Sequence, residues 1–154
     1  MFEKIISGGQ TGADRAGLDV AIDNDILHGG YCPAGRLSEE GAIPSKYELI
    51  EMGSDKYHFR TEKNVKESCA TIIFTKGPLS RGSKLTKDYC MRHRKPCLHL
   101  DFNYEKENKQ ELFRDFIDNH QVKVINIAGQ RKSSAKSIYK LTYDFLSEQL
   151  KVNS

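Results

Sequence analysis

The chain has 154 residues, of which 38% are hydrophobic and 29% charged, and its formal net charge at pH 7 is +3. This length suits one domain, because a chain of about 150 residues buries roughly 68–70% of its unfolded surface without disulfides or metals. The small net charge gives no support for a nucleic-acid binder, and no apolar run approaches the ~20 residues of a membrane helix. We therefore expect an anionic small molecule as the ligand, with no nucleic-acid and no membrane partner.

The cysteines and histidines indicate neither a disulfide framework nor a metal site. No secretory signal peptide precedes the cysteines and none of them forms a Cys-x-x-Cys pair, so we expect free thiols in a cytoplasmic protein. His93 and His99 have no partners at zinc-ligand spacing, and we expect no metal ion bound by the protein itself. The cysteines are Cys32, Cys69, Cys90 and Cys97.

The stretch from Ile5 to Arg15 contains the strongest motif. A short apolar run ends at Ser7, a glycine-rich loop covers residues 8–12, and apolar residues recur at helical spacing from Ala13 onward. This order predicts a strand, a tight loop and a helix. The glycines let the backbone approach a bound group, and the free N–H groups and dipole at the helix start favour a phosphate or another oxyanion. The predicted ligand-binding residues of this loop are Gly8, Gly9, Gln10, Thr11 and Gly12.

This loop matches neither the Gly-x-Gly-x-x-Gly order of dinucleotide sites nor the Gly-Lys-Ser/Thr ending of the P-loop, so a turn that binds nothing stays open. Ile26–Tyr31 predicts a second strand, followed by a long polar loop of the kind that is usually functional or mobile. Arg36 in that loop has a planar guanidinium that matches phosphate or carboxylate oxygens, and a solvated surface arginine is an equally good interpretation. Residues 47–50 predict a small edge strand, and Thr61 is expected to cap a helix that ends near residue 68.

Strands and helices alternate over the rest of the chain. The β-branched and aromatic run Ala70–Thr75 predicts a buried strand. A Gly/Pro loop with Lys76 and Arg81 follows it, Ser83 can cap the next helix, and Pro96 ends that helix. Apolar patterns then predict a strand at 97–101, a helix around 112–117, a strand at 122–128, a loop at 129–131 and a helix at 138–149.

Strands that alternate with helices predict an α/β fold: a single-domain, Rossmann-like, doubly wound and mostly parallel sheet with helices on both faces. We expect this domain over residues 1–151 and a frayed tail at 152–154. Ligands of such sheets bind beyond the carboxyl ends of the strands. The loops singled out above all follow strands, so we expect them to meet at one rim. Besides the first loop and Arg36, the predicted rim contains Thr75, Gly77, Gly82, Ser83, Gly129 and Arg131.

A set of short motifs spans nearly the whole chain: Ser7–Arg15, Gly29–Arg36, Gly41–Pro44, Arg60–Val65, Gly82–Thr86 and Ile127–Gly129. In this order the motifs resemble the molybdenum carrier family, the molybdenum-cofactor carrier proteins within the lysine-decarboxylase-like Rossmann superfamily. The resemblance implies a Rossmann-like fold, self-association, and a carrier that holds a molybdopterin-type cofactor without turning it over. Molybdoenzymes would be the recipients of that cofactor.

The resemblance also assigns roles to residues. It implies that the first loop meets the cofactor's phosphate or the oxygens on molybdenum, and that Arg36 lines the same pocket with Ser83 and Thr86. The family's Arg-Thr-Glu-x-Asn-Val segment corresponds here to further expected ligand contacts at Arg60, Thr61 and Asn64. The chain departs from the family pattern at residues 69, 81 and 130, where it has Cys, Arg and Gln instead of Asp, Gly and Pro.

Two other functions stay open. One is a binder or sensor of a nucleotide derivative such as ADP-ribose or AMP. The other is a phosphoribohydrolase-like enzyme of the wider superfamily, in which the glutamate of a Pro-Gly-Gly-x-Gly-Thr-x-x-Glu signature acts at the glycosidic bond. The corresponding residues 77–86 contain no glutamate, and no carboxylate pair stands at a useful spacing, which argues against hydrolysis. We therefore assign no catalytic residue and favour a binding protein over an enzyme.

Overall fold

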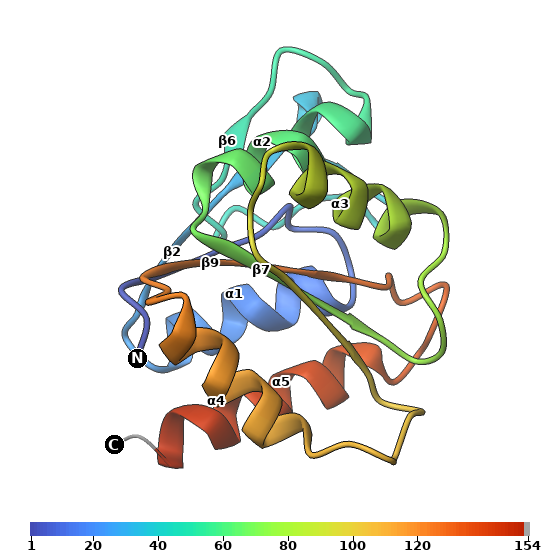
Figure 1. The fold of residues 1–154 in the computed structure, drawn as a ribbon. Coiled ribbons are helices and arrows are strands. Elements are labelled where there is room, and N and C mark those ends of the chain that lie inside the picture. The colour runs from blue at the N-terminus through green and yellow to red at the C-terminus, as the bar shows by residue number, and fades with distance from the viewer. Residues whose placement is uncertain (153–154) are drawn as a thin grey trace.

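The computed structural model describes residues 1–152, and the side chains of residues 1–151. Its centre is a five-stranded sheet in which all neighbouring strands are parallel (Figure 1). The strand order is β2-β1-β9-β7-β8. The strands are β1 (Lys4–Ile6), β2 (Leu27–Gly29), β7 (Ala70–Thr75), β8 (Cys97–Asp101) and β9 (Val124–Gly129). The predicted α/β class with a mostly parallel sheet is confirmed.

Helices cover both faces of this sheet (Figure 1). One face carries α1 (Ala13–Asp23), α4 (Lys109–Asn119) and α5 (Ile138–Val152), and the other carries α2 (Tyr57–Glu67) and α3 (Arg81–Arg92). Small residues let α1 lie close to the strands: a Cβ at Gly17 would come within 2.8 Å of Ile127 Cβ. Because helices shield both faces, central strand residues such as Ile72 and Ile125 are fully buried. Within the described residues, none of the helices combines the length and the apolar character needed to cross a membrane.

The strand order places three loops side by side. From β1 the chain proceeds to β2 on one side, from β7 it proceeds to β8 on the other, and β9 returns between β1 and β7. The loops that follow β1, β7 and β9 therefore open at the same edge, where the direction of winding reverses. Ligands of parallel α/β sheets bind at this position.

The part of the chain between β2 and α2 forms a smaller layer. It contains two two-stranded sheets: β3 (Tyr31–Cys32) pairs with β6 (Ile50–Glu51), and β4 (Leu37–Ser38) pairs with β5 (Gly41–Ala42). A single 3-10 turn, η1 (Ala34–Arg36), connects β3 to β4.

Two predicted strands of this region need correction. The strand predicted at 26–31 is interrupted at Gly30, whose φ of +126° breaks the extended backbone next to Ser7. The edge strand predicted at 47–50 shares only Ile50 with the observed β6.

Several helix boundaries also differ from the predictions. Thr61 lies inside α2, where its hydroxyl donates to the carbonyl of Tyr57, so Thr61 is not the cap of this helix. Helix α3 begins three residues earlier than predicted, with Ser80 as its N-cap and Ser83 in its first turn. Helix α5 continues through Val152, and the remaining part of the tail that we expect to fray, residues 153–154, lies outside the described residues.

Candidate functional site

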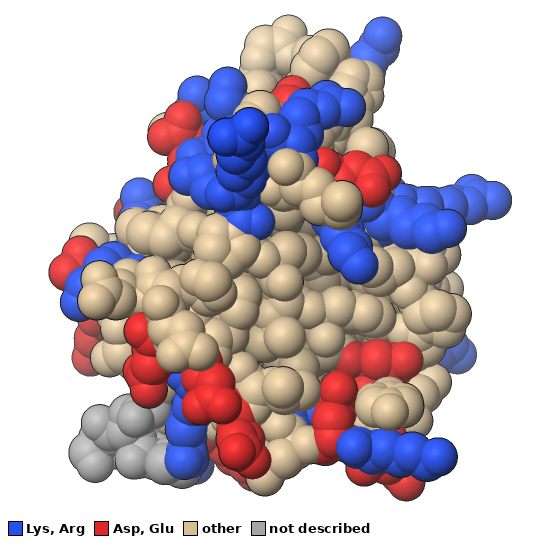
Figure 2. Space-filling model, in the orientation of Figure 1, with Lys and Arg blue, Asp and Glu red and all other residues tan. Residues whose placement is uncertain are grey.

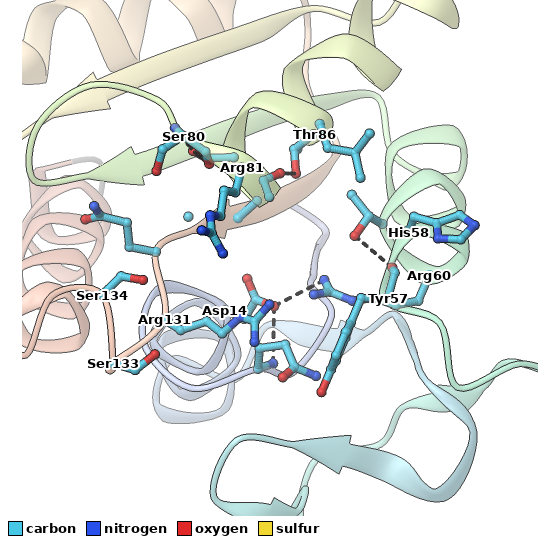
Figure 3. Close-up of a pocket in the computed structure, with 18 residues that line it drawn as sticks. Asp14, Tyr57, His58, Arg60, Ser80, Arg81, Thr86, Arg131, Ser133 and Ser134 are labelled. Carbon is cyan, nitrogen blue, oxygen red and sulfur yellow. Dashed lines mark hydrogen bonds and ion pairs between the residues drawn. The ribbon is translucent and has the colours of Figure 1, made fainter.

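A cavity of about 330 Å³ opens beyond the carboxyl ends of the central strands (Figure 3). This volume falls in the range of small-molecule sites. The loop after β1, the first turns of α2 and α3, and the loop after β9 form its wall. The lining residues are Gln10, Asp14, Tyr57, His58, Arg60, Thr61, Ser80, Arg81, Gly82, Ser83, Leu85, Thr86, Ala128, Gly129, Gln130, Arg131, Ser133 and Ser134.

A buried ion pair forms one side of the cavity. Asp14, in the first turn of α1, contacts Arg60 of α2 with an Oδ2–Nη1 distance of 3.5 Å, and the same oxygen accepts the N–H of Gln10 at 3.2 Å. Burial raises the pKa of the Asp14 carboxyl, while the charge of Arg60 and the Gln10 hydrogen bond oppose this effect. Burial likewise lowers the pKa of the Arg60 guanidinium. Each ion thus offsets part of the desolvation of the other, and burial remains the larger effect on both groups.

Two further arginines give the cavity an excess of positive charge. Arg81 points from the start of α3 into the cavity, and Arg131 approaches it from the loop after β9 (Figure 3). Within the described part of the chain, neither has a carboxylate within 4.0 Å. Tyr57 holds two of the guanidinium groups over its ring, with centroid distances of 5.0 Å to Arg131 and 5.7 Å to Arg60. This arrangement favours an anionic ligand.

The first turn of α3 adds backbone donors to the same wall. Ser83 Oγ accepts the N–H of Ser80 and donates to its carbonyl, both at 2.8 Å, which fixes the start of the helix. The N–H groups of the next residues, Arg81 and Gly82, have no acceptor within the helix, as at every helix N-terminus. A Cβ at Gly82 would meet no atom within 4 Å, so there is open space beside these donors. An oxyanion fits at this position.

The backbone at Arg81 has a φ of +38°, a value that favours glycine. This is one of the positions where the chain departs from the pattern of the family that it resembles. The departure adds a guanidinium to the cavity at the expense of local strain.

The first glycine loop is arranged differently from its prediction, because two of its N–H groups and the N–H of the first helical residue already have acceptors. The N–H of Gly9 donates to Ser7 Oγ at 3.2 Å, that of Gln10 donates to Asp14, and that of Ala13 donates to the carbonyl of Gln130 at 3.1 Å. The expectation that this loop presents free N–H groups is therefore wrong at these positions. The loop lies next to the cavity, and Gln10 is the one residue of the loop that lines the cavity wall.

Other predicted side chains hold loops together. The guanidinium of Arg36 donates to three backbone carbonyls of residues 43–47, at 2.7 to 3.0 Å, so this half-buried side chain holds its own loop and lies outside the cavity. Asn64 bonds to both the N–H and the carbonyl of Tyr31, at 2.9 and 3.0 Å. Thr75 donates to the carbonyl of Gly77 at 2.6 Å.

The predicted site residues thus divide into two groups. Those that line the cavity are Gln10, Arg60, Thr61, Gly82, Ser83, Thr86, Gly129 and Arg131. Those outside its wall are Gly8, Gly9, Thr11, Gly12, Arg36, Asn64, Thr75 and Gly77, of which Gly8 and Asn64 line a minor adjacent cavity of about 10 Å³.

Some lining residues escaped the sequence analysis. Tyr57 lies one turn before the predicted start of α2, and no strong cap marks that start. Ser133 and Ser134 follow Arg131 after one residue. Their hydroxyl groups would have been included if the loop predicted after β9 had extended to residue 134. Asp14 is different, because the sequence places it at the rim but favours a structural role for an acid at a helix start; in the structure it lines the cavity.

The donor set of the cavity suits an oxyanion. Guanidinium, hydroxyl and backbone N–H groups surround it, and Asp14 is the one carboxylate among the described lining residues. Over the described residues, no group of three or more His, Cys, Asp or Glu side chains is placed to hold a metal ion.

Comparisons with known proteins agree with this architecture. Residues 5–150 match the model of the circularly permutated YpsA SLOG family. The chain is also similar to a crystal structure, at 1.45 Å resolution, of a protein from Syntrophus aciditrophicus SB named a putative molybdenum carrier protein. The two chains share 45% sequence identity over 97% of this chain and 95% of the other, with a TM-score of 0.94. No curated protein matches the sequence.

Proposed function

The chain belongs to the circularly permutated YpsA SLOG family, and from this premise we propose that it binds and carries the molybdenum cofactor, an anionic pterin with a phosphate group. The observation that carries the proposal is the concentration of Arg60, Arg81 and Arg131 around one cavity at the start of α3. The name of the similar Syntrophus protein supports molybdenum as part of the cargo.

In this proposal the cofactor's phosphate lies at the first turn of α3. The N–H groups of Arg81 and Gly82 and the positive end of the helix dipole stabilise its charge. The guanidinium groups of Arg81 and Arg131 add charge-assisted hydrogen bonds, each of which contributes about 1.5–3 kcal/mol. The hydroxyl groups of Ser133 and Ser134, in the loop after β9, are further donors for anionic oxygens.

The charge distribution of the surface favours the approach of such a ligand. Lys and Arg side chains gather over α2 and α3, above the sheet, while acidic side chains gather over α4 and the loop after β8 (Figure 2). Helix α3 alone contains Arg81, Lys84, Lys87 and Arg92. A positive field over the helix that borders the cavity increases the rate at which an anion associates.

The cavity also favours binding over turnover. Glycosidic hydrolysis employs two carboxylates on opposite sides of the reacting bond. The described lining residues include a single carboxylate, Asp14, and its Oδ2 is engaged by Arg60 and Gln10. This supports a carrier rather than a phosphoribohydrolase.

Thermal unfolding of the ligand-free protein tests the proposal. Under anaerobic conditions the protein is heated with released molybdenum cofactor, ADP-ribose, AMP, molybdate or buffer. We expect stabilisation by the cofactor, and a smaller effect in Arg131→Gln but not in Arg114→Gln, which removes an exposed charge on α4 across the sheet. Stabilisation by ADP-ribose or AMP alone would replace the carrier with a nucleotide-derivative binder.

The proposal extends to assembly and delivery. The family resemblance implies that the protein self-associates and passes its cargo to molybdoenzymes. Sedimentation velocity measures the first property. Reconstitution of a cofactor-free molybdoenzyme by the loaded protein measures the second.

A further inference from the structure

One carboxylate oxygen of Asp14 accepts no hydrogen bond from the described residues. Its Oδ2 accepts hydrogen bonds from Gln10 and Arg60, whereas no described residue donates to its Oδ1. The side chain is 7% exposed, and it projects into the cavity on the side that faces Arg81 (Figure 3). A negatively charged acceptor is thus directed into a cavity whose other charged groups are cations.

Gln10 provides a second acceptor on the same wall. Its amide nitrogen donates to the carbonyl of Leu37 at 2.8 Å, which fixes the orientation of the amide. The opposite atom, Oε1, is buried and accepts no hydrogen bond from any described residue. A buried acceptor without a donor is unfavourable, and a small movement of this side chain toward the cavity would let a bound ligand supply the donor.

The cavity therefore has two chemically different ends. At the start of α3, Arg81 and backbone N–H groups require acceptors or negative charge from the ligand. Beside α1, Asp14 and Gln10 require hydrogen-bond donors. An inorganic anion satisfies only the first end, and its charge is repelled at the second.

We propose that Asp14 is the specificity-determining residue of this cavity, and that with Gln10 it binds a heterocycle in which a ring N–H adjoins an exocyclic amine. This donor pair occurs in the 2-amino-4-oxopyrimidine ring of pterins and in guanine. The inference deepens the proposed function and rests on it, because the same cavity holds the anionic group of the ligand. Asp14 recognises the donor groups of the ring, and the first turn of α3 binds the anionic group of the ligand.

The experiment measures the affinity of matched probes that differ at the donor pair. Pterin-6-carboxylate has the amine, and lumazine-6-carboxylate has a carbonyl oxygen in its place. GMP and AMP form a second pair, and inorganic phosphate serves as a probe of the anion site alone. Dissociation constants are measured for the wild type, for Asp14→Asn, and for Asp23→Asn, which removes a charge from the exposed end of the same helix.

We expect the wild type to bind pterin-6-carboxylate at least about tenfold more tightly than lumazine-6-carboxylate, as for a hydrogen bond to a charged acceptor. In Asp14→Asn this preference falls below about twofold, and phosphate binds more tightly because a negative charge is gone. Asp23→Asn keeps the wild-type preference. A role of Asp14 limited to neutralising Arg60 would not change the preference between the two probes.

Other results overturn the inference or the function separately. Equal affinity of the wild type for both pteridines, with phosphate competing against each, overturns the role of Asp14 and leaves an anion carrier. A preference for GMP over AMP without binding of pterin-6-carboxylate supports the role of Asp14 and overturns the pterin carrier. Failure of every probe, phosphate included, overturns both. If Asp14→Asn does not fold, the wild-type preferences still decide.

Discussion

Replacing Gly82 by valine tests whether the anion binds at the start of α3. This glycine lies in the first turn of the helix and lines the cavity. A Cβ there would meet no atom within 4 Å, and the backbone does not have a left-handed φ, so the fold accommodates the larger residue. The added methyl groups would occupy the space beside the N–H donors. We expect ligand affinity to fall at least 100-fold.

The expected shift in Tm follows from the coupling between ligand binding and unfolding. A ligand at 100 times its dissociation constant stabilises the wild type by about 2.7 kcal/mol, which raises the Tm of a chain of this length by roughly 5–10 °C. After a 100-fold loss of affinity, the same concentration contributes only about 0.4 kcal/mol and shifts the Tm by about 1 °C. Gly53→Val is the matched control, because this glycine also lies in open space, between β6 and α2. A full ligand shift in Gly82→Val would refute the proposed anion position.

Four other changes test the structure at separate points. Gly9→Val should lower the free energy of unfolding in urea by about 2 kcal/mol or more, because φ is +74° and the new Cβ would lie 2.4 Å from Leu49 Cδ1. Arg36→Ala should accelerate amide hydrogen exchange in residues 37–49 while ligand affinity stays unchanged; weaker binding would return this arginine to the site. Arg81→Gly should raise the free energy of unfolding by about 1 kcal/mol, since the φ of +38° suits glycine, and should weaken phosphate binding. Burial lowers the pKa of His99, so the folded protein binds this proton less readily than the unfolded chain does. Its contribution to stability should be complete above pH about 6.5 and be lost as the pH falls below it, and His99→Gln should flatten this part of the stability profile.

The sequence predicted strands best where the apolar pattern is unambiguous. Ala70–Thr75 and residues 97–101 have the predicted bounds, because β-branched and aromatic runs of this length form buried strands. The helix starts were less predictable. Ser80 and Ser83 are both suitable caps, and only the tertiary position of the first turn decides between them. The strand order could not be predicted, because the composition of β9 does not reveal that it lies between β1 and β7.

The rim of the site was predictable, but the role of each side chain on it was not. Arg36 and Arg131 both follow strands and look equivalent in the sequence. Arg36 donates to three backbone carbonyls of residues 43–47, whereas Arg131 lies against Tyr57 with no carboxylate partner among the described residues. Which arginine remains available to a ligand depends on acceptors that come from distant parts of the chain. Sequence spacing contains no information about those acceptors.

The charges in the first turns of α1 and α3 explain why the second helix start, rather than the first, is suited to an external anion. Both helices follow glycine-containing loops at the same edge of the sheet, so their dipoles favour negative charge equally. The first turn of α1 contains Asp14, whose carboxylate already accepts the N–H of Gln10. The first turn of α3 contains no acid and has Arg81 instead. An anion brought by a ligand therefore supplies at α3 the charge that Asp14 supplies at α1, and the free oxygen of Asp14 remains for the donor groups of that ligand.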